Sequence, residues 1–155
     1  MAISTSAAKE ELAKNKGADV FVVSRDAASL KASEGTCDMI LNTVAAPHDL
    51  KLYLPLLKKN GVLVQLGLVT EPHEVYQLPE LIMKRKSIAG SFIGGIAATQ
   101  EVVDLCFKHG IYPDCETITA DKLDWAWEQL GSNSGGLRYV VDIKRSLENK
   151  AFVPT

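Results

Sequence analysis

Two hydrophobic periods alternate along this chain, and that alternation constrains its fold more than any other feature. Short apolar runs rich in β-branched residues predict strands, and the stretches between them carry the i, i+3, i+4, i+7 spacing of amphipathic helices. The near-continuous apolar run over 62–66 is typical of a strand covered on both faces, as in parallel sheets. We therefore predict an α/β fold with a parallel sheet and right-handed crossovers. The predicted strands are 2–4, 20–23, 39–43, 62–68, 87–92 and 139–143.

The best-marked helix in the sequence carries Leu50, Tyr53, Leu54 and Leu57 on one face. Its expected limits are Pro47, which suits a first helical turn, and Gly61, which stands where a left-handed stop belongs. Pro55 lies inside this segment and is expected to kink it or to delay its start, because proline removes a donor. The other marked helices are 6–16 before Gly17, the face of Val102, Val103, Cys106 and Phe107 before Gly110, and the face of Leu123, Ala126, Trp127 and Leu130 before Gly131.

Composition excludes several classes of protein. The net charge is −2, and 17 basic residues are scattered among 19 acidic ones, so no basic stripe is available to follow a nucleic-acid backbone. No apolar run approaches the roughly 20 residues that span a bilayer, and the first residues do not resemble a signal peptide. Three cysteines without a CxxC pair argue against a disulfide framework. We expect a soluble, cytoplasmic protein with no nucleic-acid or membrane partner.

The first candidate binding segment is the strand-to-helix turn at the start of the chain. Three hydroxyl residues, Ser4, Thr5 and Ser6, meet a predicted helix N-terminus there, and Lys9 adds a positive charge one turn later. A helix N-terminus presents unpaired N–H donors, which suit either a side-chain cap or a phosphate. In a dinucleotide-binding sheet, proteins that prefer NAD usually place an acid at this point, and here no acid occurs before Glu10. The segment therefore allows two readings: a plain N-cap, or a site for the 2′-phosphate of NADP.

Three later strands end in small or glycine-bearing turns. Open α/β sheets bind ligands at the carboxyl edge of their strands, so these turns together outline one face of a cleft. Each turn alone has a plainer explanation, since a pair such as Gly94-Gly95 can simply form a tight connection. The three turns are Asn42-Thr43-Val44-Ala45, Gly67-Leu68 and Ser91-Phe92-Ile93-Gly94-Gly95.

These residues and others resemble one family from end to end, the cinnamyl alcohol dehydrogenase branch of the zinc-containing medium-chain dehydrogenases. Gly-Ser-Phe-Ile-Gly over 90–94 is the most distinctive part, while Asn42 departs from the acid that most members carry. The resemblance implies an incomplete Rossmann-type, doubly wound and mainly parallel sheet without its central first strand. The segments that carry it are Ile3-Ser4-Thr5-Ser6, Gly17-Ala18-Asp19, Thr43-Val44, Leu56-Leu57-Lys58, Gly61, Gly67, Gly90-Ser91-Phe92-Ile93-Gly94 and Arg138-Tyr139-Val140-Val141-Asp142.

The resemblance also implies roles for twelve residues, all of them in cofactor binding and none in proton transfer or metal binding. The 2′-phosphate of NADP(H) would be held by Ser4, Thr5, Ser6 and Lys9. The nicotinamide ribose would be lined by Thr43, Val44 and Ala45. The nicotinamide ring and its carboxamide would be held by Gly67, Leu68, Ser91, Phe92 and Ile93.

By the same resemblance, residues 1–95 are a partial NADP(H)-binding domain, and residues 96–155 are a helix and strand segment of the catalytic lobe. The chain has no GxGxxG turn, and its cysteines and histidines show no zinc-ligand spacing. Met1 stands where the family continues a strand, so a truncated chain is expected. Zinc belongs to the parent family, without ligands in this chain, and any NADP(H) binding by this chain is expected to be weak.

The parent activity implied by the resemblance is the reversible, zinc-assisted reduction of aldehydes to primary alcohols, with aromatic alcohols as a candidate class. The chain alone is expected to be inactive or nearly so. A second hypothesis is a nucleotide-binding or dimerisation module that acts on a full-length paralogue. The resemblance also places the strand 87–92 at the edge of the sheet, where it would pair with a second copy in a homodimer.

Overall fold

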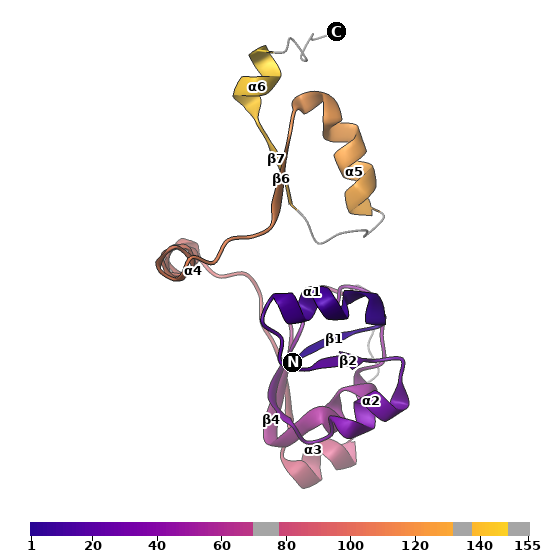
Figure 1. Ribbon diagram of the computed structural model, residues 1–155. Coiled ribbons are helices and arrows are strands. Elements are labelled where there is room, and N and C mark those ends of the chain that lie inside the picture. Colours follow the sequence, from indigo (N-terminus) through magenta and orange to yellow (C-terminus); the bar gives the residue numbers. More distant parts are fainter. Residues whose placement is uncertain (70–77, 132–137, 149–155) are drawn as a thin grey trace. The chain divides into compact units, whose positions relative to one another are not determined.

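A computed structural model describes residues 1–69, 78–131 and 138–148 (Figure 1). The chain divides into two compact units, Met1–Ile93 and Gly94–Thr155. Every pair of neighbouring strands in the described residues is parallel, and helices alternate with the strands along the chain. The α/β fold with parallel pairing that the sequence predicts is confirmed.

The described residues of the first unit form five strands in two sheets. The order of the larger sheet is β3-β4-β5, and the smaller sheet pairs β1 with β2. In the larger sheet Leu63 faces Ile40 on one side and Ile88 on the other, so its apolar side chain lies in the middle of the sheet. The strands are β1 (Ala2–Ser4), β2 (Phe21–Val23), β3 (Cys37–Asn42), β4 (Leu57–Gln65) and β5 (Ser87–Gly90).

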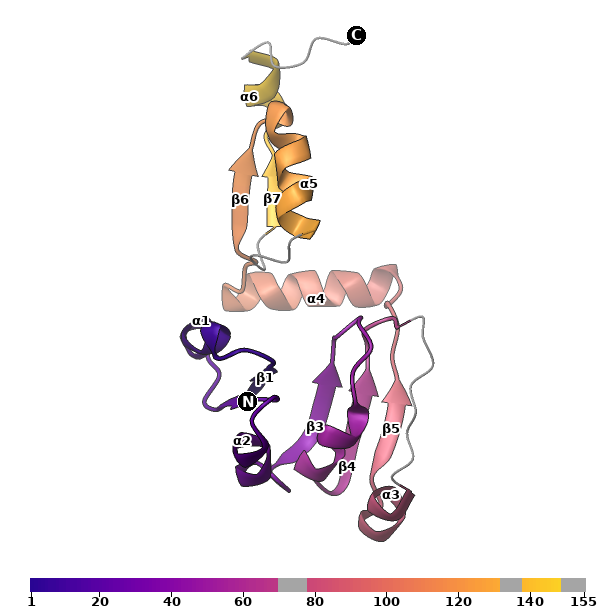
Figure 2. The ribbon, with the colours of Figure 1, turned by 90° about the vertical axis from the view of Figure 1, so that its right-hand side faces the viewer.

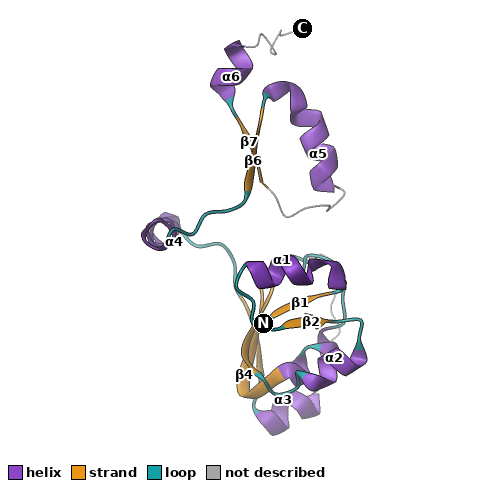
Figure 3. Cartoon of the chain, in the orientation of Figure 1, coloured by secondary structure: helices purple, strands orange, loops and turns teal. Residues whose placement is uncertain are grey.

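The helices of this unit are short. A 3₁₀ turn (Ala7–Lys9) leads into α1 (Glu10–Asn15), and α2 (Ala27–Ala32) begins where the Asp26 carboxylate accepts a hydrogen bond from the Ala28 N–H at 3.0 Å. Gly17, with φ of 93°, follows α1, as its position in the sequence predicts. Figure 3 shows α1 and α2 on opposite sides of the β1–β2 pair, which is the arrangement of a doubly wound sheet. The third helix is α3 (Leu78–Lys84).

The helix predicted over residues 47–61 is wrong. Two 3₁₀ turns, Leu50–Leu52 and Leu54–Leu56, take its place, and β4 begins directly at Leu57. Pro55 lacks the N–H that an α-helix would need there, so the segment breaks into single turns. The left-handed residue is Asn60, with φ of 65°, and not Gly61. Four residues then separate Leu57, which pairs with Cys37, from Val62, which pairs with Met39.

Leucines from the broken segment nevertheless form most of the core of the first unit. One buried cluster contains Leu50, Leu54, Leu57 and Leu63, and the other contains Val22, Leu30 and Leu56. Ile40 and Tyr53 are partly buried and pack against both clusters. The apolar face predicted from the sequence is therefore buried, although the backbone that carries it is not an α-helix.

Over 94–131 and 138–148, the second unit combines one parallel strand pair with three α-helices. Gly110, with φ of 64°, ends the long helix at the predicted stop. The strand β6 and the helix α6 are absent from the prediction, because neither segment has a clear apolar period. The elements are α4 (Ile96–His109), β6 (Cys115–Ile118), a 3₁₀ turn (Ala120–Lys122), α5 (Leu123–Gly131), β7 (Arg138–Val141) and α6 (Ile143–Glu148).

Candidate functional site

The ends of three neighbouring strands meet at one edge of the larger sheet. Because β3, β4 and β5 are parallel and adjacent, their carboxyl ends lie side by side (Figure 2). Backbone hydrogen bonds tie the turns together: the carbonyl of Asn42 accepts from the N–H groups of Leu66 at 2.8 Å and Gly67 at 3.0 Å, and the carbonyl of Gln65 accepts from the Ser91 N–H at 3.1 Å. The three turns singled out in the sequence therefore adjoin one another.

Gly67 is at the point of closest approach between two of these turns. A Cβ atom added to it would lie 2.2 Å from the Val44 carbonyl oxygen and 2.9 Å from the Ala45 nitrogen. Backbone atoms cannot yield as a flexible side chain can, so any larger residue would push the turns apart. The glycine is thus explained by contact between the chain's own turns, a reason that the sequence does not reveal.

A polar network fixes the same two turns. The side-chain amide of Asn42 donates to the Gln65 side-chain oxygen at 2.6 Å, and the Gln65 amide donates to the Gly67 carbonyl at 2.7 Å. His48 Nδ1 lies 2.7 Å from the Ala46 carbonyl, which can only accept, so Nδ1 carries the proton. His48 Nε2, 2.8 Å from Asn42 Nδ2, then accepts.

This network gives a physical reason for an amide at position 42. Asn42 is buried, and its side-chain amide donates to Gln65 and His48 while its oxygen, 3.3 Å from the Val44 N–H, accepts. An ionised acid has only acceptors and could not replace it in this arrangement. Sequence reasoning missed the network, and its only signal was the pair of amides, Asn42 and Gln65, that end two apolar runs.

The hydroxyl cluster at the end of β1 has a clear local role for one of its members. The Ser6 hydroxyl oxygen accepts a hydrogen bond from the Ala8 N–H at 3.2 Å and so caps the 3₁₀ turn. This is the plain N-cap reading of the segment. Ser4 is half-buried at the end of β1, whereas Thr5 and Lys9 are exposed. The Ser6 hydroxyl can also donate a second hydrogen bond from the same position, because a hydroxyl group can donate one hydrogen bond while it accepts another.

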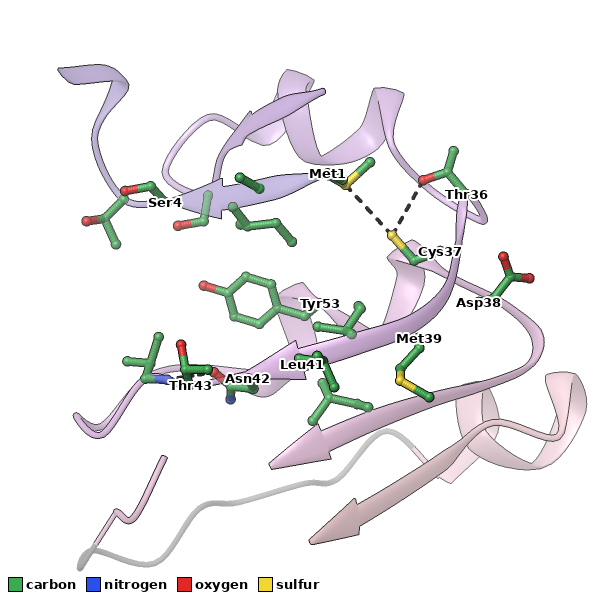
Figure 4. Close-up of a pocket in the computed structure, with 17 residues that line it drawn as sticks. Met1, Ser4, Thr36, Cys37, Asp38, Met39, Leu41, Asn42, Thr43 and Tyr53 are labelled. Carbon is green, nitrogen blue, oxygen red and sulfur yellow. Dashed lines mark hydrogen bonds between the residues drawn. The ribbon is translucent and has the colours of Figure 1, made fainter. Parts of the chain in front are cut away.

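Two cavities of the first unit reach this edge of the sheet. The first, of about 620 Å³, lies between β1 and β3, and its lining includes Ser4, Thr5, Thr43 and Val44 (Figure 4). The second, of about 600 Å³, lies at the ends of β4 and β5. Of the twelve residues singled out in the sequence, its lining includes Gly67, Leu68, Ser91 and Phe92. The lining of neither cavity includes Ser6, Lys9, Ala45 or Ile93.

The described residues do not fit a bound zinc ion. Among them, no three His, Cys, Asp or Glu side chains come close enough to share a metal. His73 lies outside the described residues. Within the same described ranges, no helix is both long enough and apolar enough to cross a membrane.

Comparison with known proteins identifies a family and several relatives that the chain resembles. Residues 1–108 match the family model described as zinc-binding dehydrogenase. The chain is 46% identical over 142 residues to the aldehyde reductase YahK of Escherichia coli, covering 92% of the chain and 41% of that protein. A cinnamyl alcohol dehydrogenase from Sorghum bicolor shares its structure with a TM-score of 0.83 and 37% identity, over 90% of the chain and 40% of that protein.

A third relative was solved with a nucleotide. The cinnamyl alcohol dehydrogenase of Helicobacter pylori complexed with NADP(H) matches with a TM-score of 0.75 and 34% identity, over 93% of the chain and 41% of that protein. The chain thus spans about two fifths of the length of these relatives. The family match covers more than half of the chain, and together with the shared fold it shows that the chain belongs to the zinc-binding dehydrogenase family.

Proposed function

We propose that the first unit is the NADP(H)-holding part of an alcohol dehydrogenase that interconverts aldehydes and primary alcohols. The observation that carries this proposal is the meeting of three parallel strand ends in adjoining turns, held by backbone bonds and by the Asn42–Gln65 contact. Carboxyl edges of this kind are where open α/β sheets bind nucleotides. The relative from Helicobacter pylori, described as complexed with NADP(H), supports the choice of cofactor.

The end of β1 would hold the 2′-phosphate. Ser6 keeps its oxygen on the Ala8 N–H and can still donate its own proton to a phosphate oxygen. Ser4 and Thr5 add hydroxyl donors on the wall of the first cavity, and the exposed ammonium of Lys9 supplies the positive charge. An NAD-type ribose has no phosphate there, so this group of residues would set the preference for NADP(H).

The later turns would hold and orient the nicotinamide end. Thr43, Val44 and Ala45 would line its ribose, and Gly67 and Leu68 would lie against the ring. When bound, the nicotinamide ring supplies or accepts the hydride. We assign these residues only binding and orientation, and we propose that any metal and proton-transfer groups come from outside the described residues.

The last turn has the residues suited to an apolar ring. Phe92 and Ile93 are 79% and 81% exposed at the end of β5, so they are free to contact the nicotinamide or an aromatic substrate. Ser91 uses its N–H on the Gln65 carbonyl, which leaves its side chain and carbonyl for the carboxamide. The second unit would then pack on the catalytic lobe of the same enzyme.

A homodimer is the partner that the edge of the larger sheet favours. All four residues of β5 are exposed, and among the described strands β4 alone pairs with it, along one of its two edges. Free edges of this kind recruit further strands, and two copies paired through β5 would be related by a two-fold axis. The same edge supports the second candidate function, a nucleotide-binding module that pairs with a longer paralogue. Sedimentation of the chain alone, and then mixed with such a paralogue, separates the two.

Calorimetric titration of the full chain with NADPH and with NADH tests the cofactor assignment. We expect NADPH to bind more tightly, and we expect Lys9→Glu to reduce that preference by at least about tenfold, since a hydrogen bond to a charged group contributes roughly 1.5–3 kcal/mol. Lys31→Glu is the matched control, because it makes the same charge change at the last turn of α2. An NADPH preference that survives Lys9→Glu unchanged would remove the phosphate assignment.

A further inference from the structure

The turn after β3 is closed by the side chains at its two ends. Asn42 is the last residue of β3, and Figure 4 shows it beside Thr43 at the carboxyl end of the strand. His48 lies six positions after Asn42, beyond the turn 43–47. Its Nε2 atom is 2.8 Å from the side-chain nitrogen of Asn42, so a hydrogen bond joins the start of the turn to its end. The backbone between the two residues is therefore part of a ring that side chains close.

Backbone groups fix the direction of every hydrogen bond in this ring. The Gly67 carbonyl can only accept, so Gln65 turns its amide nitrogen to it and its oxygen to Asn42. The Val44 N–H can only donate, so the Asn42 oxygen faces it. The Asn42 nitrogen then donates both to Gln65 and to His48. If either amide were turned over, two donors or two acceptors would face each other, so the network has one consistent arrangement.

His48 also ties this turn to the core of the first unit. The side chain is half-buried, and its ring meets the Tyr53 ring edge to face, with centroids 5.9 Å apart. Tyr53 in turn packs against both buried apolar clusters. On its other side the His48 ring places Nδ1 2.7 Å from the Ala46 carbonyl. A residue that is not assigned to cofactor binding thus connects the turn to the packed interior.

We propose that His48 is a positioning residue for the nicotinamide end of the cofactor, and that it holds the turn 43–46 in its ligand-binding shape through Asn42 and Ala46. The inference rests on the proposed function, which places the nicotinamide ribose at 43–45. Without the two bonds of His48 the turn would sample other shapes, and the apparent affinity of a ligand falls with the fraction of molecules in the competent shape. The 2′-phosphate, held at the end of β1, would not depend on His48.

Calorimetry with two ligands tests this difference between the two ends. NADPH spans both ends, whereas 2′,5′-ADP carries only the adenosine end with its 2′-phosphate. His48→Phe keeps an aromatic ring beside Tyr53 and removes both ring nitrogens. We expect it to weaken NADPH binding about tenfold and to leave 2′,5′-ADP binding within about twofold of the parent. A general loss of structure would weaken both ligands alike, so the split between them reports positioning.

Two further variants complete the comparison. His48→Gln restores an acceptor for Asn42 and a donor for the Ala46 carbonyl, so NADPH binding should return to within about threefold of the parent. His109→Phe makes the same replacement as His48→Phe at an exposed histidine in the last turn of α4, and it should change neither affinity. Urea unfolding of each variant shows that folded chains are being compared.

A second measurement needs neither ligand nor variant. Long-range ¹H–¹⁵N spectra of a neutral imidazole distinguish its two tautomers. We expect His48 to carry its proton on Nδ1, because the Ala46 carbonyl accepts that proton and Asn42 donates to Nε2. The exposed His109 is the reference within the same spectrum. This readout tests the network even where His48→Phe does not fold.

Four results would overturn the inference while leaving the proposed function in place. They are NADPH binding by His48→Phe that equals the parent, an equal loss of NADPH and 2′,5′-ADP by the folded variant, a His48 proton on Nε2, and a parent chain that binds NADPH no more tightly than 2′,5′-ADP. In the last case the nicotinamide end would not be held at all. A parent chain that binds neither ligand would instead overturn the proposed function, and this inference with it.

Discussion

The two units of this molecule contain similar elements but differ in how those elements are held. In Met1–Ile93 the strands enclose two clusters of buried leucine and valine side chains. In the described part of the second unit, Ile118 and Ala126 are the only buried apolar residues, while Ile96 of α4 is 92% exposed and Trp127 of α5 is 70% exposed. Local sequence is enough to define a helix, but a core requires packing partners. We infer that the first unit is held mainly by its own packing.

The largest effect is expected from truncating a core side chain in the first unit. Leu54 is fully buried, so Leu54→Ala should lower the free energy of unfolding by about 2–5 kcal/mol, measured by urea denaturation of the full chain. Leu105→Ala on α4, where the side chain is 55% exposed, should change it by less than about 1 kcal/mol. Equal losses in the two variants would break the contrast between the units.

The next effect concerns ion pairs. The fully buried Lys86 ammonium donates to the Leu54 carbonyl at 2.6 Å and to the Glu80 carboxylate at 2.7 Å. Glu80→Gln should cost about 1.5–3 kcal/mol, because it weakens a bond between charged groups. In the second unit the pair of Lys144 and Glu148 is exposed at 4.0 Å, and Glu148→Gln should have no measurable effect on unfolding.

The pH dependence of that pair has a definite sign. The hydrogen bond from Lys86 lowers the pKa of the Glu80 carboxyl below its ordinary value of 4.5. The unfolded chain then binds the proton first, so the stabilisation is complete above pH 4.5 and is lost as the pH falls through the lower pKa of the folded protein. Urea unfolding at stepped pH should show this loss in the parent chain and a flatter curve in Glu80→Gln. An identical pH dependence of the unfolding free energy in the two chains would contradict this role of the Glu80 carboxylate.

A smaller effect tests the junction of the turns. Gly67→Ala should destabilise the chain by about 1–3 kcal/mol, because the added Cβ meets the Val44 backbone. It should also weaken NADPH binding in calorimetry. Gly90→Ala is the matched control, since nothing lies within 4 Å of its Cβ position. If both glycines tolerate alanine, the turns are not in the contact described above.

The smallest effect compares two helix starts. Ser6 caps its 3₁₀ turn with a side-chain bond, so Ser6→Ala should cost about 0.5–1 kcal/mol in urea unfolding. Thr119 stands at the corresponding position before Ala120–Lys122 in the second unit and makes no such bond. Thr119→Ala should therefore be neutral, and a cost as large as that of Ser6→Ala would remove the distinction.

The sequence predicts what depends on local pattern and misses what depends on distant contacts. β-Branched runs located most of the strands, and Gly17 and Gly110 marked helix ends. The helix predicted over 47–61 is wrong because Pro55 prevents a continuous α-helix despite the apolar spacing. The segment Cys115–Ile118 is a strand only because β7 pairs with it, since its own sequence lacks a clear period.

The candidate site shows the same division. Sequence reasoning identified the three turns because each contains small residues at a strand end. It could not find the network of Asn42, Gln65 and His48, because Asn42 and Gln65 are 23 positions apart and meet only through the register of β3 and β4. Nor could it explain why position 67 is a glycine, because the reason is the close approach of the Val44 backbone.

The central claim is that the strand ends of the first unit hold a dinucleotide phosphate at one end and a nicotinamide at the other. Titration of the ¹⁵N-labelled full chain with NADPH, followed by amide chemical shifts, tests it most directly. The account predicts that the shifted amides fall in residues 4–9, 43–45, 67–68 and 91–93. Shifts confined to Gly94–Thr155, or no shifts at saturating NADPH, would contradict it.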